Sequence, residues 1–265
     1  MIWDSHIHTQ FSGDCETSIF DILHQAKENK LPGITITDHL DLIYPEDPTL
    51  FLLDLPEYDE TIRHLRNESA DLPVRYGIEL GLAEGIEKEY AKIVATYDYD
   101  FVIGSSHMVH GKDPYYPEYF AGRTVKQAYE EYFKSILENI RCWDGFDVYG
   151  HLDYVVRYGS DDKNPYDPND YMDLFDEILK ELIVRGKGIE VNTAGLAYGL
   201  PHPHPAIPIV KRYRELGGEI LTIGSDAHKM ENVGYGFAQI PDLMRSCGFQ
   251  YYCVFENRKP EFIPL

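Results

Sequence analysis

Seven short runs rich in β-branched and aromatic residues recur along this chain, and a stretch with helical periodicity follows each of the first six. The runs are 2–6, 33–37, 74–78, 101–105, 147–151, 188–192 and 219–224. Apolar residues at helical spacing predict helices at 18–29, 58–68, 85–95, 124–141, 170–185 and 205–216. Strands that alternate with helices are typical of a parallel sheet with right-handed crossovers. The chain is therefore predicted to have an α/β fold.

Histidines and carboxylates stand at the carboxyl ends of nearly all these strands. In a doubly wound sheet, ligand groups gather at one switch point, whereas in a barrel they come from the ends of most strands. The distribution therefore favours a barrel. The apolar run 249–255 is short and is not assigned as an eighth strand, so the prediction is an irregular barrel of seven strands.

The length of 265 residues fits either one large barrel domain or two small domains. No apolar run is long enough to span a bilayer, and the chain begins Met1-Ile2-Trp3-Asp4, without a basic region or an apolar signal core. We therefore expect a cytoplasmic protein with no membrane partner. The four cysteines lack C-x-x-C spacing, which argues against a disulfide framework and against a thiolate metal site.

The charge balance restricts the partners of the protein. With 24 basic and 45 acidic residues the formal charge is −21, which repels nucleic acid and anionic membranes at long range. Much of this acidity is expected to be ordinary solvated surface. A small phosphorylated substrate would need a local positive centre, which bound divalent ions would supply.

The strand ends and the loop after the first strand supply a set of nitrogen and oxygen donors. His6 and His8 are two residues apart, so on an extended segment they point to the same side. Six of the eleven histidines stand at such ends, with three carboxylates beside them, which makes nine nitrogen and oxygen donors. Such a set exceeds what one ion uses and predicts two or three metal ions, with Zn, Mn or Fe as candidates because thiolates are missing. Asp38 and Asp153 also follow strands, where a carboxylate is often a helix N-cap.

The order of these motifs resembles the polymerase and histidinol phosphatase (PHP) family over essentially the whole chain. The motifs are H-x-H on the first strand, T-D-H at 37–39, a lone Glu on the third strand, His on the fourth and fifth, and D-x-H at 226–228. The resemblance implies a single domain over 1–265, folded as a distorted (β/α)7 barrel with the metal site at the C-terminal ends of its strands. It also implies nine ligands that hold three divalent ions: His6, His8, Asp14, His39, Glu79, His107, His151, Asp226 and His228.

Two further segments indicate a branch of that family. G-H-L-D at 150–153 followed by Arg157-Tyr158, and E-V-N-T-A-G-L at 190–196, most resemble the stand-alone histidinol-phosphate phosphatases. This resemblance implies hydrolysis of L-histidinol phosphate to L-histidinol and phosphate. A basic residue is expected shortly after the second segment, but Ala197 and Tyr198 follow. A phosphoesterase of another substrate, such as a sugar phosphate, a phosphotyrosine peptide or a nucleotide, is therefore the alternative.

The expected mechanism is in-line attack on phosphorus by a hydroxide that bridges two metals. Glu79 is the candidate for a bridging carboxylate, and Asp226, His228 or a metal-bound water is expected to protonate the leaving group. Arg157 is expected to clamp the phosphate, since a guanidinium pairs bidentately with it; the alternative is a surface ion pair.

Four other residues are expected to contact the substrate: Tyr158, Asn192, His110 and His202. For Tyr158 the alternative is simple packing, and for His110 it is a solvated loop position. The prolines around 201–205 make that segment an extended rim loop instead of a metal-binding strand end. The aromatic run 115–120 is expected either to form a wall over the substrate or to cover the core.

Two other function classes share part of this pattern. Amidohydrolases also begin with H-x-H but usually carry a lysine on the fourth strand, where this chain has Ser105-Ser106-His107. A non-catalytic metal-binding module would share the donors without turning over an ester. The sequence does not indicate the oligomeric state.

Overall fold

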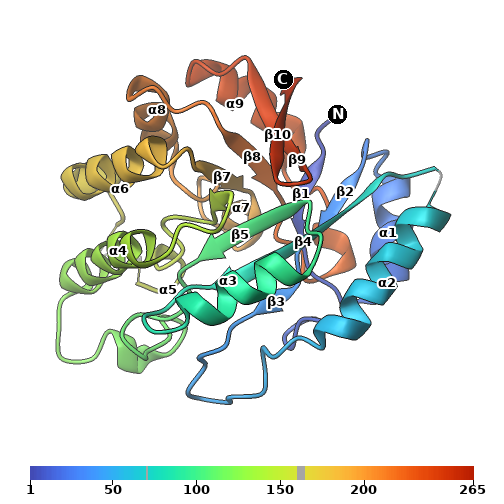
Figure 1. Ribbon diagram of the computed structural model, residues 1–265. Helices are drawn as coiled ribbons and strands as arrows, with labels where there is room; N and C mark the ends of the chain where they lie inside the picture. The colour runs from blue at the N-terminus through green and yellow to red at the C-terminus, as the bar shows by residue number, and fades with distance from the viewer. Residues whose placement is uncertain (70, 160–164) are drawn as a thin grey trace.

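The computed structural model of the protein describes residues 1–69, 71–159 and 165–265 (Figure 1). Its main sheet is parallel, and neighbouring strands follow the order β1-β2-β4-β5-β6-β7-β8, with the short β3 also paired to β4. These strands are β1 (Asp4–Ile7), β2 (Ile34–Ile36), β3 (His39–Leu40), β4 (Val74–Gly81), β5 (Phe101–Ser105), β6 (Val148–Tyr149), β7 (Gly188–Asn192) and β8 (Leu221–Gly224). Each of the seven predicted strands is present.

The first and last strands of this sheet approach each other and nearly close it into a barrel. Ile7 forms an isolated parallel bridge with Ala227. The amide of His8 donates to the carbonyl of Ala227 at 3.0 Å, and the amide of Asp226 donates to the carbonyl of His6 at 2.8 Å. The predicted seven-stranded (β/α) barrel is therefore confirmed, and its closure joins the segment that carries His6 and His8 to the segment that carries Asp226.

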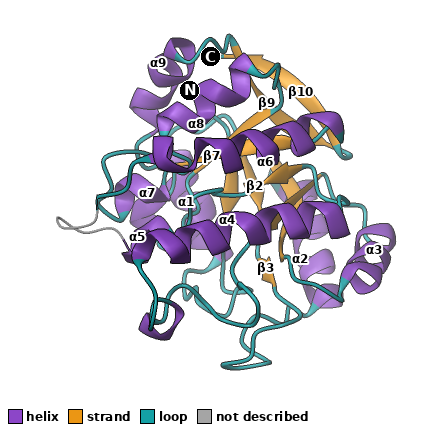
Figure 2. Ribbon diagram, turned by 90° about the vertical axis from the view of Figure 1, so that its left-hand side faces the viewer, coloured by secondary structure: helices purple, strands orange, loops and turns teal. Residues whose placement is uncertain are grey.

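Helices surround the strands in both ribbon views (Figures 1 and 2). They are α1 (Ile19–Glu28), α2 (Leu55–Glu68), α3 (Glu87–Thr96), α4 (Val125–Cys142), α5 (Val156–Gly159), α6 (Met172–Val184), α7 (Ala194–Ala197), α8 (Ile207–Glu215) and α9 (Ile240–Ser246). The six predicted helices correspond to α1, α2, α3, α4, α6 and α8. The sequence prediction omitted α5, α7 and α9, which have four to seven residues and are too short to show a clear helical period.

Helix α1 shows how local sequence sets an element. The hydroxyl of Ser18 accepts a hydrogen bond from the amide of Asp21, as an N-cap residue does. Ile19, Ile22 and Ala26 are buried one turn apart, so one face of the helix packs on the sheet. Burial of each such side chain contributes about 1–3 kcal/mol to folding.

Buried tyrosines attach the next two helices to the carboxyl ends of the strands. The hydroxyl of Tyr58, on α2, donates to the carbonyls of Ile36 and Gly77 at 3.2 and 2.9 Å. The hydroxyl of Tyr90, on α3, donates to the carbonyl of Gly81 at 2.8 Å. Each ring supplies apolar area and its hydroxyl satisfies carbonyls that the short strands leave unpaired.

An antiparallel hairpin, β9 (Tyr251–Glu256) with β10 (Lys259–Pro264), follows the barrel. Cys253 and Phe255 pack with Phe101, Ile103 and Val148 in a small cluster of their own. The run 249–255, left unassigned from the sequence, is therefore largely a strand. Its apolar residues meet those of β5 and β6, which lie about 100 or more residues earlier in the chain.

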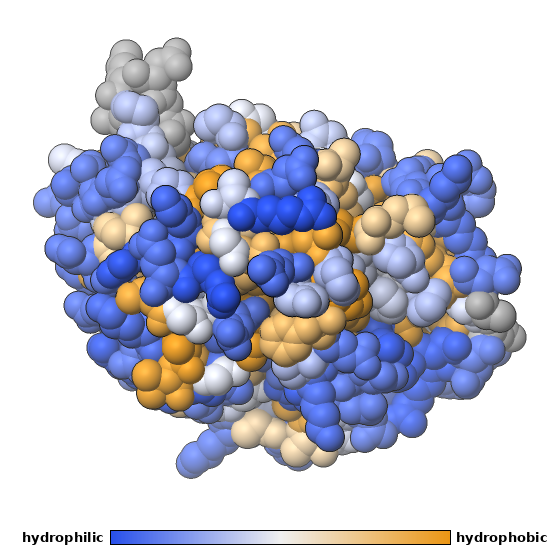
Figure 3. All heavy atoms as spheres, turned by 90° about the horizontal axis from the view of Figure 1, so that it is seen from above, coloured by the Kyte–Doolittle hydropathy of each residue, from blue (hydrophilic) through white to orange (hydrophobic). Residues whose placement is uncertain are grey.

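The surface agrees with the acidic composition. The face seen in Figure 3 is hydrophilic over most of its area, with scattered apolar patches. In the part of the chain that the structure describes, no helix is both long and apolar enough to cross a membrane.

Candidate metal centre

The nine predicted donors converge at the carboxyl ends of the strands around Glu79. Oε2 of this carboxylate lies 2.9 Å from Nδ1 of His39 and 3.3 Å from Nε2 of His6. Oε1 lies 3.0 Å from Nε2 of His151 and 3.3 Å from Nε2 of His107. Both oxygens of one carboxylate thus face imidazoles from four different strand ends, which is the arrangement that a bridging ligand requires.

Two further carboxylates complete the cluster. Asp226 Oδ1 lies 3.2 Å from Nε2 of His8. Asp14 Oδ2 lies 3.2 Å from Nε2 of His228 and 3.9 Å from Nε2 of His39. All nine predicted metal ligands are therefore brought together in one site.

Several ring nitrogens at this centre lie close to one another. Nε2 of His6 and Nε2 of His8 are 3.0 Å apart, and Nε2 of His39 and of His228 are 3.4 Å apart. Such pairs of lone pairs repel unless a cation lies between them. Within the described residues, three overlapping groups have donor atoms close enough to share an ion: His8, His39 and His228; His6, His8 and Glu79; His39, Glu79 and His107.

Unpaired buried atoms give a second indication that the donors fit metal ions. Nδ1 of His39, Nδ1 of His151 and Oε2 of Glu79 are buried without a hydrogen bond; the 2.9 Å approach of His39 to Glu79 lacks hydrogen-bond geometry. A buried polar atom without a partner costs about 1–3 kcal/mol, so a cluster of them marks a place where a ligand is expected. Imidazole and carboxylate donors without thiolate suit Zn, Mn or Fe.

The remaining ring nitrogens are held by partners that fix the tautomer. Nδ1 of His6 donates to Glu190 Oε1 at 2.6 Å, and Nδ1 of His107 donates to Asp41 Oδ2 at 2.8 Å. With Nδ1 protonated, the lone pair of each Nε2 points into the centre. The sequence analysis missed Glu190 and Asp41. Glu190 stands two residues before Asn192 on β7, so the strand period placed it on the same side, but nothing in the sequence named His6 as its partner.

His8 has a longer chain of such partners. Its Nδ1 donates to the hydroxyl of Ser12 at 3.0 Å, and that hydroxyl donates to Asp38 Oδ1 at 2.7 Å. Asp38 also accepts from the amide of Thr9 at 2.6 Å. The expectation that Asp38 is a helix N-cap is therefore wrong, because the next helix begins at Leu55 and the carboxylate instead fixes the loop after β1.

Burial and opposite charges act together on the pKa values here. Burial alone would raise the pKa of Glu79, but His6, His39 and His107 hold it well below its usual value. Burial alone would lower the pKa of His228, but the hydrogen bond and the charge of Asp14 raise it to about 9. In the metal-free protein, a proton therefore stays on His228 at neutral pH.

This proton occupancy predicts a pH-dependent metal affinity. At pH 7, titration of metal-free protein with Zn²⁺ is expected to release protons, because the ion must displace the proton from His228. Affinity is expected to fall as the pH falls, since the imidazoles become more protonated. Calorimetry in two buffers of different ionisation enthalpy would measure the release, and binding without proton release would contradict the prediction.

The backbone at Asp226 is strained. This residue has φ 53°, in the left-handed region that non-glycine residues rarely adopt. The conformation costs about 1–3 kcal/mol and is retained where the surrounding structure fixes it. It allows one carboxylate oxygen to face the histidines while Oδ2 accepts from Arg157 Nη2 and Asn192 Nδ2, both at 3.2 Å.

A pocket of about 340 Å³ opens directly onto this centre. Besides six of the nine donors, it is lined by Asp41, Tyr44, Leu50, Phe51, Asp113, Tyr115, Tyr116, Tyr154, Arg157, Tyr158 and Tyr198. The aromatic run 115–120 thus contributes two rings to the wall. One end of the pocket is therefore formed by the candidate metal ligands, and its walls are mainly aromatic.

The residues expected to contact substrate have different positions. Arg157 and Tyr158 line the pocket. Asn192 is buried behind Asp226 and donates to it. His110 and His202 do not line this pocket; His110 is half exposed and lies beside Glu131 and Glu138, and Nδ1 of His202 faces the carbonyl of Pro203. Contact between either histidine and a substrate stays a prediction.

The segment after β7 lacks the expected basic residue, and its aromatic residue contacts the arginine of the pocket instead. Tyr198 places its ring 4.7 Å from the Cζ of Arg157, and the ring of Tyr154 lies 4.8 Å from the same atom. The guanidinium therefore makes cation–π contacts with two aromatic rings, which favour a cation at this place. Positive charge at this end of the pocket comes from Arg157.

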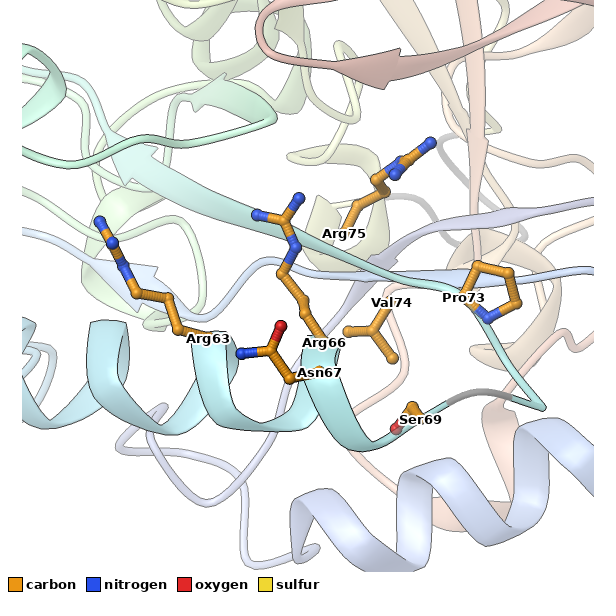
Figure 4. A pocket seen from close by; sticks show the side chains of 7 residues that line it. All are labelled: Arg63, Arg66, Asn67, Ser69, Pro73, Val74 and Arg75. Carbon is orange, nitrogen blue, oxygen red and sulfur yellow. The ribbon is translucent and has the colours of Figure 1, made fainter.

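A second hollow, of about 600 Å³, lies between α2 and the start of β4, away from the metal centre (Figure 4). Arg63, Arg66 and Arg75 line it. Each is already paired with a carboxylate, and the partners are Asp59, Asp100 and Glu256 respectively. The hollow therefore offers little net positive charge for an anion.

Comparison with known proteins identifies the family. The PHP domain family matches residues 4–194, well over half of the chain. The chain belongs to the PHP domain family. A probable histidinol-phosphatase of Clostridium acetobutylicum is 34% identical over 250 residues, covering 94% of this chain and 95% of that protein. The histidinol-phosphatase of Lactococcus lactis is 27% identical over 259 residues, covering 97% and 95%.

A solved structure agrees with these relatives. The crystal structure of the histidinol phosphate phosphatase of Lactococcus lactis, complexed with zinc, L-histidinol and phosphate, superposes on this PHP protein with a TM-score of 0.89 at 26% identity. The match covers 98% of each chain. The family resemblance inferred from the strand-end motifs is therefore confirmed.

Proposed function

We propose that the protein is a metal-dependent phosphomonoesterase that hydrolyses L-histidinol phosphate to L-histidinol and phosphate. The observation that carries the proposal is the convergence of nine nitrogen and oxygen donors at the floor of a pocket that also holds Arg157 and, on its wall, Asp113. The relatives that bear this activity in their names cover nearly the whole chain, and the similar crystal structure contains zinc, L-histidinol and phosphate.

The donor set would hold three divalent ions: His6, His8, Asp14, His39, Glu79, His107, His151, Asp226 and His228. Such ions lower the pKa of bound water to about 7 and neutralise charge on phosphoryl oxygens. The protein itself fixes the donors through Glu190, Asp41 and Ser12, so little reorganisation is needed when the substrate arrives.

Three side chains act on the phosphoryl group and on the leaving group. Arg157 presents a guanidinium to the phosphoryl oxygens, which it can bind with two parallel hydrogen bonds. Asp226 and His228 line the same pocket and are the candidates to hold the proton that the departing alkoxide takes. Glu79 is the candidate bridging carboxylate.

The wall of the pocket suits a cationic leaving group. Asp113 is buried, with Oδ2 accepting from the hydroxyl of Tyr44 at 3.0 Å and Oδ1 accepting from the amide of Tyr115 at 2.7 Å. Burial raises its pKa, so a positive charge at this place would relieve the cost of keeping the carboxylate ionised. Histidinol carries an ammonium and an imidazole. Both fit a carboxylate among tyrosine rings.

Replacing Asp113 with Asn tests this assignment. The change keeps the shape of the side chain and removes its charge, so the KM for L-histidinol phosphate is expected to rise about tenfold, as for loss of one charged hydrogen bond. The effect on p-nitrophenyl phosphate, which has no ammonium, is expected to be much smaller. Steady-state kinetics with the two esters would measure the difference.

Asp242→Asn, on the exposed side of α9, is the matched control for this change. Equal effects of Asp113→Asn on both esters would contradict the role of Asp113 in recognising a cation, while leaving the phosphatase assignment intact.

A PHP-type phosphoesterase of another substrate is the second candidate. The observation that favours it is Ala197, where a basic residue is expected in the histidinol-phosphate branch. A panel of L-histidinol phosphate, sugar phosphates, a phosphotyrosine peptide and nucleotides would decide. Turnover of p-nitrophenyl phosphate with none of L-histidinol phosphate would exclude the first candidate.

Three other expectations stay predictions. We propose that residues 1–265 form one domain, because a single apolar core includes residues from Ile2 to Val254. A cytoplasmic location stays an expectation, and the lack of a nucleic-acid partner is expected from the formal charge of −21.

A further inference from the structure

A buried carboxylate and a buried histidine stand behind Arg157, outside the set of metal donors. Asp153 lies two residues after His151, and His204 lies in the extended segment after α7. Both side chains are fully buried. The segment that contains His204 was interpreted from the sequence as a rim loop that does not bind metal, and Asp153 as a candidate helix N-cap.

His204 accepts a hydrogen bond from Arg157 and donates one to Asp153. Arg157 Nε lies 2.9 Å from His204 Nε2, and because a guanidinium only donates, Nε2 must accept. The ring proton is then on Nδ1, which donates to Asp153 Oδ1 at 2.5 Å. Both ring nitrogens are therefore used, and neither remains for a metal ion.

Each end of the pair is anchored in the fold. The backbone of His204 exchanges two hydrogen bonds with Asn192 at the end of β7, at 2.6 and 2.7 Å. Asp153 Oδ2 accepts from the amide of Ala206, directly before α8, at 2.8 Å. The histidine ring thus has little freedom to turn, and it gives the guanidinium a fixed acceptor.

The other sides of the guanidinium are also occupied. Its Cζ lies 4.8 and 4.7 Å from the ring centroids of Tyr154 and Tyr198, and Nη2 donates to Asp226. In the described chain, Nη1 has no hydrogen-bond acceptor. Arg157 lines the pocket although its side chain is only 6% exposed. Nε and Nη2 are therefore held by acceptors of the protein, and Nη1 remains for a ligand in the pocket.

We propose that Asp153 and His204 are positioning residues that orient the guanidinium of Arg157 to bind the phosphoryl group of the substrate. The proposal rests on the proposed phosphatase function, in which Arg157 binds phosphate. In this proposal, the extended segment positions His204, and His204 holds Arg157 without contacting the substrate.

Four variants of the metal-loaded protein test the proposal: His204→Ala, His204→Gln, Asp153→Asn and Arg157→Ala. The measurements are the inhibition constant of inorganic phosphate, kcat and KM for p-nitrophenyl phosphate, the metal content and the thermal unfolding midpoint. His24→Ala, on the exposed face of α1, is the matched control. Calorimetric binding of inorganic phosphate replaces inhibition if no ester is turned over, so failure of the proposed function is recognised separately.

Removal of the acceptor in His204→Ala is expected to weaken phosphate binding and to raise KM, each about tenfold, the cost of one hydrogen bond to a charged group. The metal content is expected to stay unchanged. His204→Gln is expected to recover part of the loss, because its amide oxygen reaches toward the position of Nε2. In the Arg157→Ala background, His204→Ala is expected to add little, since the two residues act as a unit.

Two results would overturn the proposal. One is unchanged phosphate binding in a folded, metal-loaded His204→Ala or Asp153→Asn protein. The other is an equal loss from His204→Ala with and without Arg157, which would show that the histidine acts independently of the arginine. If His204→Ala does not fold, His204→Gln and Asp153→Asn decide by the same measurements.

Discussion

Replacing Glu79 with Gln is expected to lower kcat/KM for any phosphoester by about 1,000-fold, the upper range for loss of one preorganised electrostatic group. The amide has nearly the same shape, but it carries no charge and only one oxygen. Both oxygens of Glu79 face imidazoles that come from four strand ends, so the variant loses its central carboxylate. Kinetics with p-nitrophenyl phosphate and elemental analysis of the purified protein would measure the two consequences.

The metal content of this variant separates two causes of inactivity. We expect fewer ions per chain, because Glu79→Gln removes the negative charge and one of the two oxygens that would hold the ions together with the histidines. Glu89→Gln, exposed on α3, is the control that changes the same chemical group far from the centre. Full activity of the Glu79→Gln protein would contradict both the bridging role and the metal-dependent mechanism.

Replacing Arg157 with Ala is expected to lower kcat/KM by about 100-fold, because the phosphoryl oxygens lose their only guanidinium from the pocket wall. Among the described residues that line the pocket, Arg157 is the one arginine or lysine. Arg157→Lys keeps the charge but loses the planar pair of donors, so it is expected to recover only part of the activity. The inhibition constant of inorganic phosphate would report the same loss without catalysis.

Arg141→Ala is the matched control, because this arginine is half exposed and pairs with Glu181 on the outside of the barrel. Since Arg157 also donates to Asp226, the metal content of the variant must be measured. A normal inhibition constant for phosphate in the Arg157→Ala protein would show that its ion pair with Asp226 is structural and that phosphate is bound by the metals alone.

The sequence by itself determined the composition and the location of the centre. Parallel strands joined by helices place their carboxyl ends at one end of the barrel, so residues such as His8 and His228 had to meet there although 220 positions separate them. The residue types then restricted the chemistry to nitrogen and oxygen ligands. The seven strands and the six histidines followed from local patterns, whereas the choice of Asp14, Glu79 and Asp226 as the carboxylate ligands came from the family resemblance.

Local sequence patterns did not predict contacts between segments that lie far apart in the chain. The strand 251–256 pairs with a neighbouring strand but packs its apolar residues on β5, and no period in the sequence indicates that contact. Asp113 and Tyr44, which form part of the aromatic chamber, are 69 residues apart. Their meeting depends on the course of two long loops.

Only the tertiary structure decided which carboxylate forms a hydrogen bond with which histidine. Glu190 bonds His6 across 184 residues, and Asp153 bonds His204 across 51. In the sequence, neither carboxylate can be told apart from a solvated acidic residue or a helix N-cap. What distinguishes them is burial beside one particular imidazole, because a buried carboxylate must find a donor and the ring then has only one nitrogen left to offer. That pairing is set by how the barrel closes and packs.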